Sequence, residues 1–369
     1  MKIIRPLCAA LVLLAASGCG GHTTPTAPVR GPGPTTTTAD SVVLLEDLST
    51  RQVFPTDNWW NADVSHAPVD AGSAAYIDWI SGRTPQNPSA TRHAHPDFGP
   101  PPYGMPYVVV GANQPLLPVA FSPYGDESDA GAPGRPPGYP IPAEAQLQAG
   151  YIEGGVAGGG TSGDRHLLVI DRARGLLFET WATHWNAQGA TWEAGSGAVF
   201  NLLSNARRPD GWTSADAAGL AIFPGLVRYD EVAAATAIRH AFRVTLRATN
   251  GDVWPASHAA GVTAGAPPLG ARLRLKPGKD LSGYAPEVQR IFQAMKTYGL
   301  IVADNGTDLY VSGTMDARWD NDVLNPAFAS LTADDFDVIE LGWGKPTTGV
   351  APARAATRTI AIGGRGRDH

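Results

Sequence analysis

The sequence predicts a mainly β fold, a β-sandwich or barrel-like body with a few peripheral helices. The chain has 369 residues, of which 43 are glycine and 32 are proline, so turns must be frequent. Charged residues make up only 17 % and hydrophobic residues 43 %, which favours a packed core over a disordered chain. Short apolar runs alternate with turn signals, as is typical of β-rich proteins.

Three pairs of apolar runs, each separated by a turn signal, predict β-hairpins. The runs are 166–171 with 176–181, 243–249 with the chain from 253, and 300–303 with 309–312. The last two pairs flank an Asn-Gly dipeptide, which favours the tight type I′ turn of a hairpin.

Few segments have the periodicity of a helix. The strongest covers 286–298, starts with a proline and ends just before Gly299. Its apolar residues fall on one face: Val288, Ile291, Phe292 and Met295. Shorter helices are predicted at 73–80 and 230–238.

The first 18 residues have the pattern of a signal peptide. Lys2 and Arg5 precede an apolar run from 7 to 16, which is too short to span a membrane. The run ends in Ala-Ser-Gly-Cys19, which resembles the lipobox of bacterial lipoproteins, although alanine replaces the more common leucine three residues before the cysteine. The resemblance implies lipidation of Cys19 and an exported protein held at the cell envelope, in the outer membrane if the cell has one. The alternative is an ordinary secretory signal.

The rest of the chain divides into three parts. We expect a lipid-anchored Thr/Pro/Gly tether over 19–42, one globular domain over 43–345 and a disordered basic tail over 346–369. The formal net charge is −6, and because the signal and the tail are both basic, the domain is more acidic than the whole chain. An acidic domain argues against nucleic acid as a partner, and membrane contact is expected only through the lipid anchor.

Several chemistries can be set aside. The second cysteine, Cys8, leaves with the signal, so the domain has no thiol nucleophile. The G-x-S-x-G, phosphate-loop and dinucleotide motifs are absent. His240 and His258 flank a predicted hairpin, but its register would place their side chains on opposite faces. The sequence therefore predicts neither a cofactor nor a metal.

Carboxylates within loops rich in glycine and aromatic residues are the strongest catalytic candidates. Glycoside hydrolysis needs two such groups, one protonated and one ionised. The candidate acids are Asp97, Glu153, Asp164, Asp216, Asp230 and Glu231, with His166 and Arg228 expected to orient them.

Structural roles compete for some of these acids. Thr213 and Asp216 match a capping box, and Asp230 and Glu231 open a predicted helix. Asp304 lies beside an Asn-Gly dipeptide and is interpreted as a turn residue.

Tryptophan residues in loops suggest platforms on which sugar rings stack. The candidates for substrate binding are Trp185, Trp192 and Trp212. The alternative role for each is packing in the core of a β protein.

Several longer strings resemble those of a group of secreted bacterial proteins that carries no assigned activity. They are HPDFG (95–99), GDRH (163–166), GWTSADAAGL (211–220) and PGLVRYDEV (224–232). The resemblance implies an exported single-domain protein and brings no catalytic residue with it. The chain departs from the group's pattern at Ala94 and Ser257.

Together these observations predict a surface-anchored carbohydrate-active enzyme, a glycoside hydrolase that acts on a polysaccharide or oligosaccharide through paired carboxylates. A non-catalytic glycan-binding or envelope-interaction lipoprotein is the first alternative. A His/Asp metal-dependent hydrolase is the second.

Overall fold

The computed structural model describes residues 41–131 and 135–346. The predicted signal peptide, Cys19, the tether up to residue 40 and the tail from residue 347 lie outside the described residues. Within the two described ranges, no helix is both long and apolar enough to cross a membrane.

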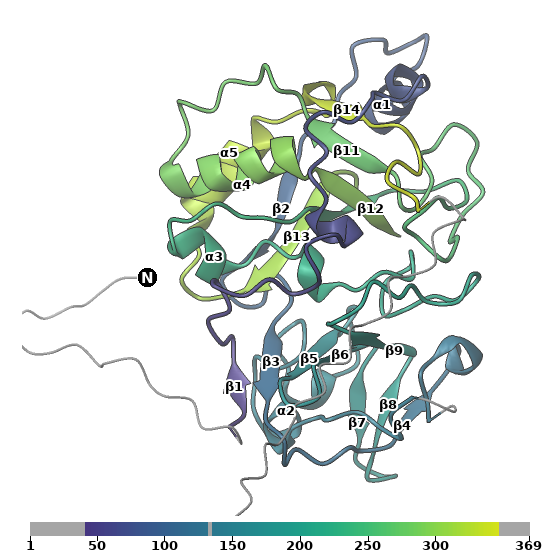
Figure 1. The fold of residues 1–369 in the computed structure, drawn as a ribbon, viewed down its shortest axis with the longest axis vertical. Coiled ribbons are helices and arrows are strands. Elements are labelled where there is room, and N and C mark those ends of the chain that lie inside the picture. Colours follow the sequence, from purple (N-terminus) through teal and green to yellow (C-terminus); the bar gives the residue numbers. More distant parts are fainter. Residues whose placement is uncertain (1–40, 132–134, 347–369) are drawn as a thin grey trace, which may run out of the picture. The chain divides into compact units, whose positions relative to one another are not determined.

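Most of the regular structure lies in three mixed β-sheets (Figure 1). The five-stranded sheet has the order β1 (Val43–Leu44), β3 (Tyr107–Val110), β5 (Leu167–Asp171), β6 (Leu176–Trp181), β9 (Ser196–Asn201). The six-stranded sheet has the order β14 (Phe336–Val338), β11 (Arg272–Leu275), β12 (Leu300–Asn305), β10 (Phe242–Leu246), β13 (Tyr310–Met315), β2 (His95–Gly99). The smallest sheet has the order β4 (Val119–Phe121), β8 (Thr191–Ala194), β7 (His184–Asn186). The β-rich prediction is confirmed, but the described strands form open sheets rather than a closed barrel.

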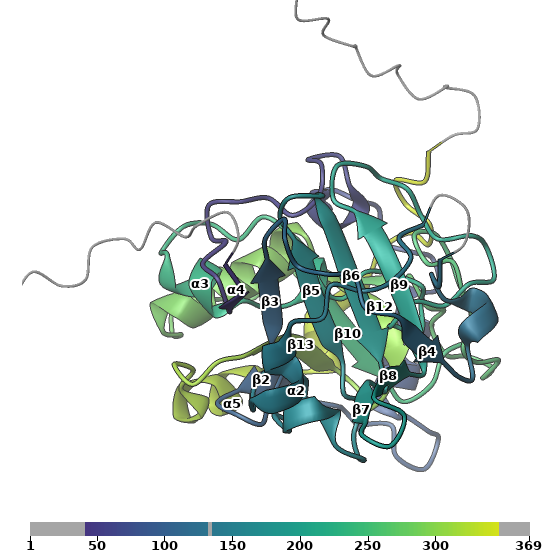
Figure 2. The same cartoon turned by 90° about the horizontal axis from the view of Figure 1, so that it is seen from below.

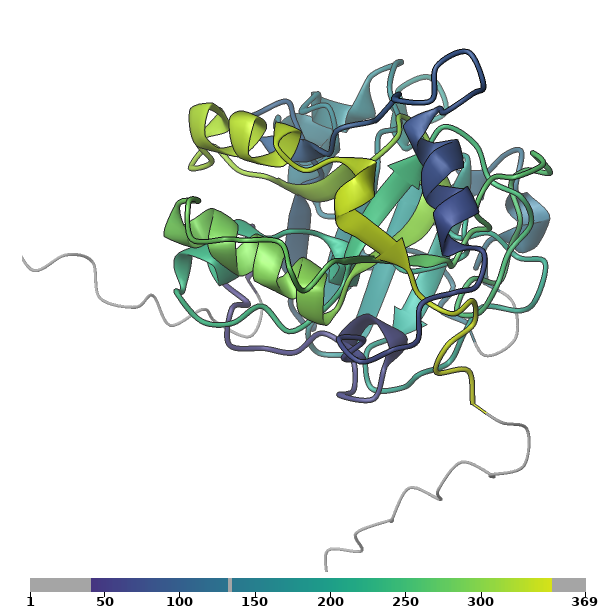
Figure 3. The same ribbon diagram turned by 90° about the horizontal axis from the view of Figure 1, so that it is seen from above.

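Helices are few and lie beside the sheets. They are α1 (Ser73–Ser81), α2 (Ala143–Leu147), α3 (Tyr229–Ala233), α4 (Pro286–Thr297) and α5 (Asn321–Ala329). Five short 3₁₀ turns accompany them in the described chain: Trp59–Asn61, Gly125–Glu127, Ala157–Gly159, Phe223–Gly225 and Ala333–Asp335. Figure 3 shows α1, α4 and α5 against one face of the six-stranded sheet. The helix predicted at 230–238 is shorter than expected and ends at Ala233.

The α4 helix has the boundaries that its sequence predicts. Pro286 occupies the first turn, where its missing N–H costs nothing, and Gly299 follows with a φ of 74°. The four residues of the predicted apolar face are all fully buried: Val288, Ile291, Phe292 and Met295. They pack into the core that also holds strand residues of both larger sheets.

The hairpin predicted at 166–181 is confirmed, because β5 and β6 pair antiparallel from Leu167–Thr180 to Asp171–Leu176. Both faces of β5 are buried. Leu168 and Ile170 belong to the main core, whereas Leu167 and Val169 belong to a second core under the smallest sheet. This alternation follows from the two-residue period of a strand.

The two hairpins predicted at Asn-Gly dipeptides are wrong. Strand β10 lies between β12 and β13, so the runs at 300–303 and 309–312 do not pair with each other. The chain after Gly251 does not pair with β10 either, because β12 and β13 occupy both of its edges. Strand pairing between distant segments therefore overrides the local propensity for a tight turn. Because the second hairpin does not form, the register predicted for His240 and His258 is also wrong.

The arrangement brings the two larger sheets close together. Seen from below, the strands of the five-stranded sheet lie in front of β10, β12 and β13 (Figure 2). The segment between β9 and β10 carries Asp216 and runs past both sheets, since Ala218 bonds to Ala303 and Ile222 bonds to Glu179. Charged side chains from both sheets consequently meet in this region.

Candidate functional site

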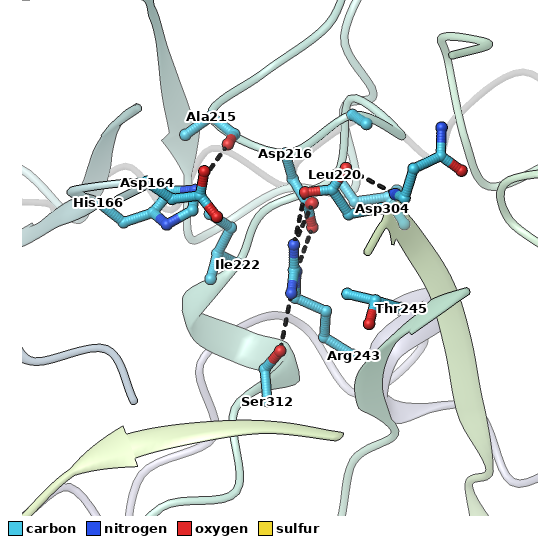
Figure 4. Close-up of polar contacts among 12 residues, drawn as sticks. Asp164, His166, Ala215, Asp216, Leu220, Ile222, Arg243, Thr245, Asp304 and Ser312 are labelled. Carbon is cyan, nitrogen blue, oxygen red and sulfur yellow. Dashed lines mark hydrogen bonds and ion pairs between the residues drawn. The ribbon is translucent and has the colours of Figure 1, made fainter. Parts of the chain in front are cut away.

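A buried arginine organises the region where the sheets approach. Arg243 on β10 has a side chain that is only 3 % exposed, yet all three of its guanidinium nitrogens are bonded. Nε and Nη2 donate to Asp216 at 2.9 and 2.8 Å, and Nη1 donates to Ser312 at 2.7 Å (Figure 4). Nη2 also donates to Asp304 at 2.9 Å. The planar fork of the guanidinium thus fixes two carboxylates, which a lysine could not do in the same way.

Asp304 at the end of β12 is the carboxyl group in this cluster that is suited to donate a proton. Its side chain is 28 % exposed, whereas that of Asp216 is fully buried. Burial and the negative charge of Asp216 raise the pKa of Asp304 to about 6, against the opposing influence of Arg243. A group with this pKa exchanges its proton near neutral pH, as a general acid must.

His166 lies beside this cluster and is held as a cation. Its Nδ1 donates to Glu153 at 2.7 Å and its Nε2 donates to the carbonyl oxygen of Ala215 at 3.1 Å. Both partners only accept hydrogen bonds, so both ring nitrogens carry protons. Burial alone would lower the pKa of His166, but the Glu153 carboxylate outweighs it and raises the pKa to about 9. His166 therefore supplies a fixed positive charge rather than a general base.

Glu179 on β6 is a fully buried acid that binds the backbone of the segment after Asp216. Its carboxylate accepts hydrogen bonds from the backbone N–H groups of Ile222 and Phe223 at 2.8 Å. Burial raises the pKa of Glu179 to about 7, and those two bonds oppose the shift. Because Glu179 holds the segment that follows Asp216, we interpret it as a positioning residue.

Two further acids lie near His166. Asp97 on β2 is half-buried, and burial raises its pKa although Arg243 opposes the shift. Asp164, just before β5, is exposed and accepts a hydrogen bond from the indole Nε1 of Trp181 at 3.3 Å. Figure 4 shows Asp164 beside His166, with Asp216 and Asp304 across the view.

A pocket of about 300 Å³ opens over these groups. Three carboxylates line it, those of Asp164, Asp216 and Asp304, together with the aromatic rings of Tyr124 and Trp181. The two rings meet edge to face at 6.2 Å. Gly195 lets the Trp181 ring lie against the backbone, because a Cβ at that position would overlap the ring. The pocket thus combines acids with flat apolar surfaces.

The structure separates the predicted acids into two groups. Asp164 and Asp216 line this pocket, and Asp97, Glu153 and His166 lie next to them. The capping-box interpretation of Asp216 is wrong, since no helix follows it and its carboxylate binds Arg243. The other three predicted residues, Arg228, Asp230 and Glu231, form a separate cluster near α3.

That second cluster is internally paired. Arg228 is fully buried, with Nε 3.3 Å from Asp230 and Nη2 2.6 Å from Glu231. Glu231 also accepts a hydrogen bond from His240 at 2.9 Å. Asp230 accepts the backbone N–H of Leu48 at 2.6 Å. These residues hold the amino-terminal segment against α3 and do not line the pocket of Asp304.

None of the three predicted sugar-binding tryptophans lines the pocket of Asp304. Trp192 is buried and packs edge to face on Trp185 at 5.5 Å. Trp212 lies against the guanidinium of Arg208 at 5.4 Å. Trp185 lines a different pocket, of about 460 Å³, beside the smallest sheet.

Sequence reasoning missed Arg243, Asp304 and Trp181, which are central to the pocket. Asp304 is interpreted from the sequence as a turn residue because it lies beside an Asn-Gly dipeptide. Trp181 ends a predicted strand, and therefore it is not among the loop tryptophans expected to bind sugar. Arg243 could have been suspected, because an arginine inside the apolar run FRVTL needs buried acidic partners.

Within residues 41–131 and 135–346, no three histidine or acidic side chains converge in a way that could hold a metal ion. Comparisons of the chain with protein-family models, curated proteins and solved structures gave no match. The geometry of the site is therefore the basis for its function.

Proposed function

We propose that this protein is an exported, surface-anchored glycoside hydrolase that cleaves a polysaccharide with paired carboxylates, Asp304 and Asp164. One observation carries the proposal: a partly exposed carboxyl group with a pKa of about 6 shares a pocket with a second, solvent-facing carboxylate. Glycosidic hydrolysis needs an acid that protonates the leaving oxygen and a carboxylate on the other side of the sugar.

In the proposed reaction, Asp304 donates its proton to the glycosidic oxygen as the bond to the anomeric carbon breaks. The Asp304 carboxylate that results is stabilised by Arg243 and by the backbone N–H of Asn305, which donates at 2.7 Å. Asp164 takes the second role, in which it either activates water or attacks the anomeric carbon. Water finally supplies the proton that restores Asp304.

The surrounding residues support a sugar as the substrate. The aromatic rings of Trp181 and Tyr124 line the pocket, and sugar C–H groups pack well on aromatic rings. Asn305 and His258 line the same pocket and provide polar atoms for hydroxyl groups. The predicted signal peptide and Cys19 support a location at the cell envelope, where polysaccharides are accessible.

A non-catalytic glycan-binding role is the alternative, and the Trp185 pocket favours it. That pocket combines a half-buried indole with the amide side chains of Gln146, Asn186 and Gln188. Neutral amides around an aromatic ring suit an uncharged sugar and need no acid pair. The pocket would also suit a remote sugar unit of a long substrate.

A reducing-end assay of the purified protein across a panel of polysaccharides separates these functions. New reducing ends support the hydrolase, whereas binding without product supports the glycan-binding alternative. The same assay after chelation tests the His/Asp metal hydrolase, because activity lost on chelation and regained with added metal would favour that mechanism.

A further inference from the structure

A second pocket, of about 340 Å³, lies between the segment 49–53 and the chain around α3. Its ionisable lining residues are Arg51, Arg228, Glu231, Arg239 and His240. The pocket therefore gathers three arginines in a domain that is acidic as a whole. A positively charged pocket in a domain of negative net charge indicates an anion-binding site.

Among the residues that the structure describes, two of these arginines have no partner for their charge. Arg51 and Arg239 are both exposed, and no ion pair or side-chain hydrogen bond joins either guanidinium to another residue in the described part of the chain. By contrast, Arg243 and Arg208 each bind a carboxylate. Two unpaired arginines at one pocket leave room for an anion from solution.

The buried arginine at the same pocket is also incompletely satisfied. Nη1 of Arg228 has no hydrogen-bond partner among the described residues, although the side chain is only 1 % exposed. A buried donor without an acceptor costs about 1–3 kcal/mol. An acceptor atom that enters the pocket would remove this cost.

The acids beside the pocket do not balance its arginines. Glu231 and the adjacent Asp230 both pair with Arg228, and the ring of His240 bonds to Glu231 at 2.9 Å and to the carbonyl oxygen of Ala241 at 2.9 Å. Two carboxylates therefore stand against three guanidinium groups, so a positive excess remains.

We propose that this pocket binds a small organic oxyanion, the carboxylate or phosphate group of a sugar-sized molecule. Arg51 and Arg239 would bind the anionic group through their guanidinium groups. Nη1 of Arg228 would donate a further hydrogen bond to it. Polar side chains complete the lining and suit the hydroxyl groups of such a ligand: Ser49, Thr50, Asn61 and Thr236. The volume is large enough for a sugar and its charged group. The proposal is independent of the hydrolase, because the two pockets share no lining residue.

Titration calorimetry with glucose 6-phosphate, glucuronate, inorganic phosphate and glucose tests the proposal. We expect at least one sugar anion to bind and glucose not to bind; the stronger of the two sugar anions identifies phosphate or carboxylate as the preferred group. Arg51→Gln and Arg239→Gln should each weaken binding about tenfold, because each removes one charge-assisted contact.

Arg92→Gln is the matched control, since its side chain is 54 % exposed and lies outside this pocket. It should leave the affinity unchanged, as should Asp304→Asn. Absence of binding by both sugar anions, or binding that survives both the Arg51 and the Arg239 substitutions, would overturn the proposal.

Discussion

Asp216 and Asp304 both accept a hydrogen bond from the same nitrogen, Nη2 of Arg243, at 2.8 and 2.9 Å. Burial and the negative charge of Asp216 favour the protonated form of Asp304, whose side chain is 28 % exposed. Asp304 is therefore the member of this pair whose pKa rises to about 6, while Asp216 stays locked against the guanidinium.

Replacing Arg243 with methionine should destabilise the fold strongly. The substitution leaves Asp216 buried without its partner, and breaking a buried ion pair in this way costs about 3–5 kcal/mol. Urea unfolding at neutral pH measures the loss. Arg207→Met is the control: its partner Asp210 is 90 % exposed, so the cost should be about 1 kcal/mol or less. Equal losses in the two variants would show that Arg243 does not organise the site.

Glu179 should make the free energy of unfolding depend on pH. Its pKa is about 7 in the folded protein and near 4.5 otherwise, so the folded state holds the proton more tightly. The stabilisation of the folded state by protonated Glu179 is complete below pH 4.5 and is lost as the pH rises through 7. The total change in the free energy of unfolding is about 3 kcal/mol.

Glu179→Gln tests this dependence, because glutamine does not titrate. Urea unfolding at pH 5 and pH 7 should show a smaller decrease in stability for the variant than for the wild type. Identical decreases would mean that Glu179 does not hold a proton in the folded state.

His166 should remain protonated at neutral pH. Its pKa of about 9 predicts that the imidazole resonances, followed by NMR and assigned with His166→Asn, titrate well above the pH of an exposed ring. Glu153→Gln should lower the pKa of His166, since the carboxylate charge that raises it is removed. Titration of His166 near 6.5 in the wild type would contradict the cationic assignment.

Trp181, rather than the loop tryptophans, should bind the sugar. Trp181→Ala is expected to raise KM about fivefold on a responsive polysaccharide, because packing on an aromatic ring contributes about 1 kcal/mol. Trp212→Ala is the control, since Trp212 does not line the pocket. Steady-state kinetics on both variants measure the difference, and a larger effect from Trp212 would relocate the sugar site.

The sequence predicted the elements whose signals are local. Helix α4 follows from one apolar face between a proline and a glycine, and the β5–β6 hairpin follows from two adjacent apolar runs. The pairing of β10 with β12 and β13 could not be predicted in this way, because those strands are more than 50 residues apart along the chain. The Asn-Gly dipeptides then suggested hairpins that distant pairing prevents.

The same limit applied to the candidate site. Asp164 and Asp216 were predicted as isolated acids in glycine-rich loops, and both line the pocket. Asp304 was assigned to a turn, because its function depends on Arg243, a residue 61 positions away. Asp230 and Glu231 are acids in a sequence context like that of the other candidates. Only the structure shows that they lie outside the pocket of Asp304.

The turnover of Asp304→Asn on a polysaccharide that the wild type cleaves tests the central claim most directly. Asparagine keeps an oxygen for Arg243 and for the N–H of Asn305, so the fold should survive, which circular dichroism can verify. We expect the rate to fall at least about a hundredfold, because the amide cannot donate the catalytic proton. A folded variant that retains the wild-type rate would contradict the assignment of Asp304 as the acid.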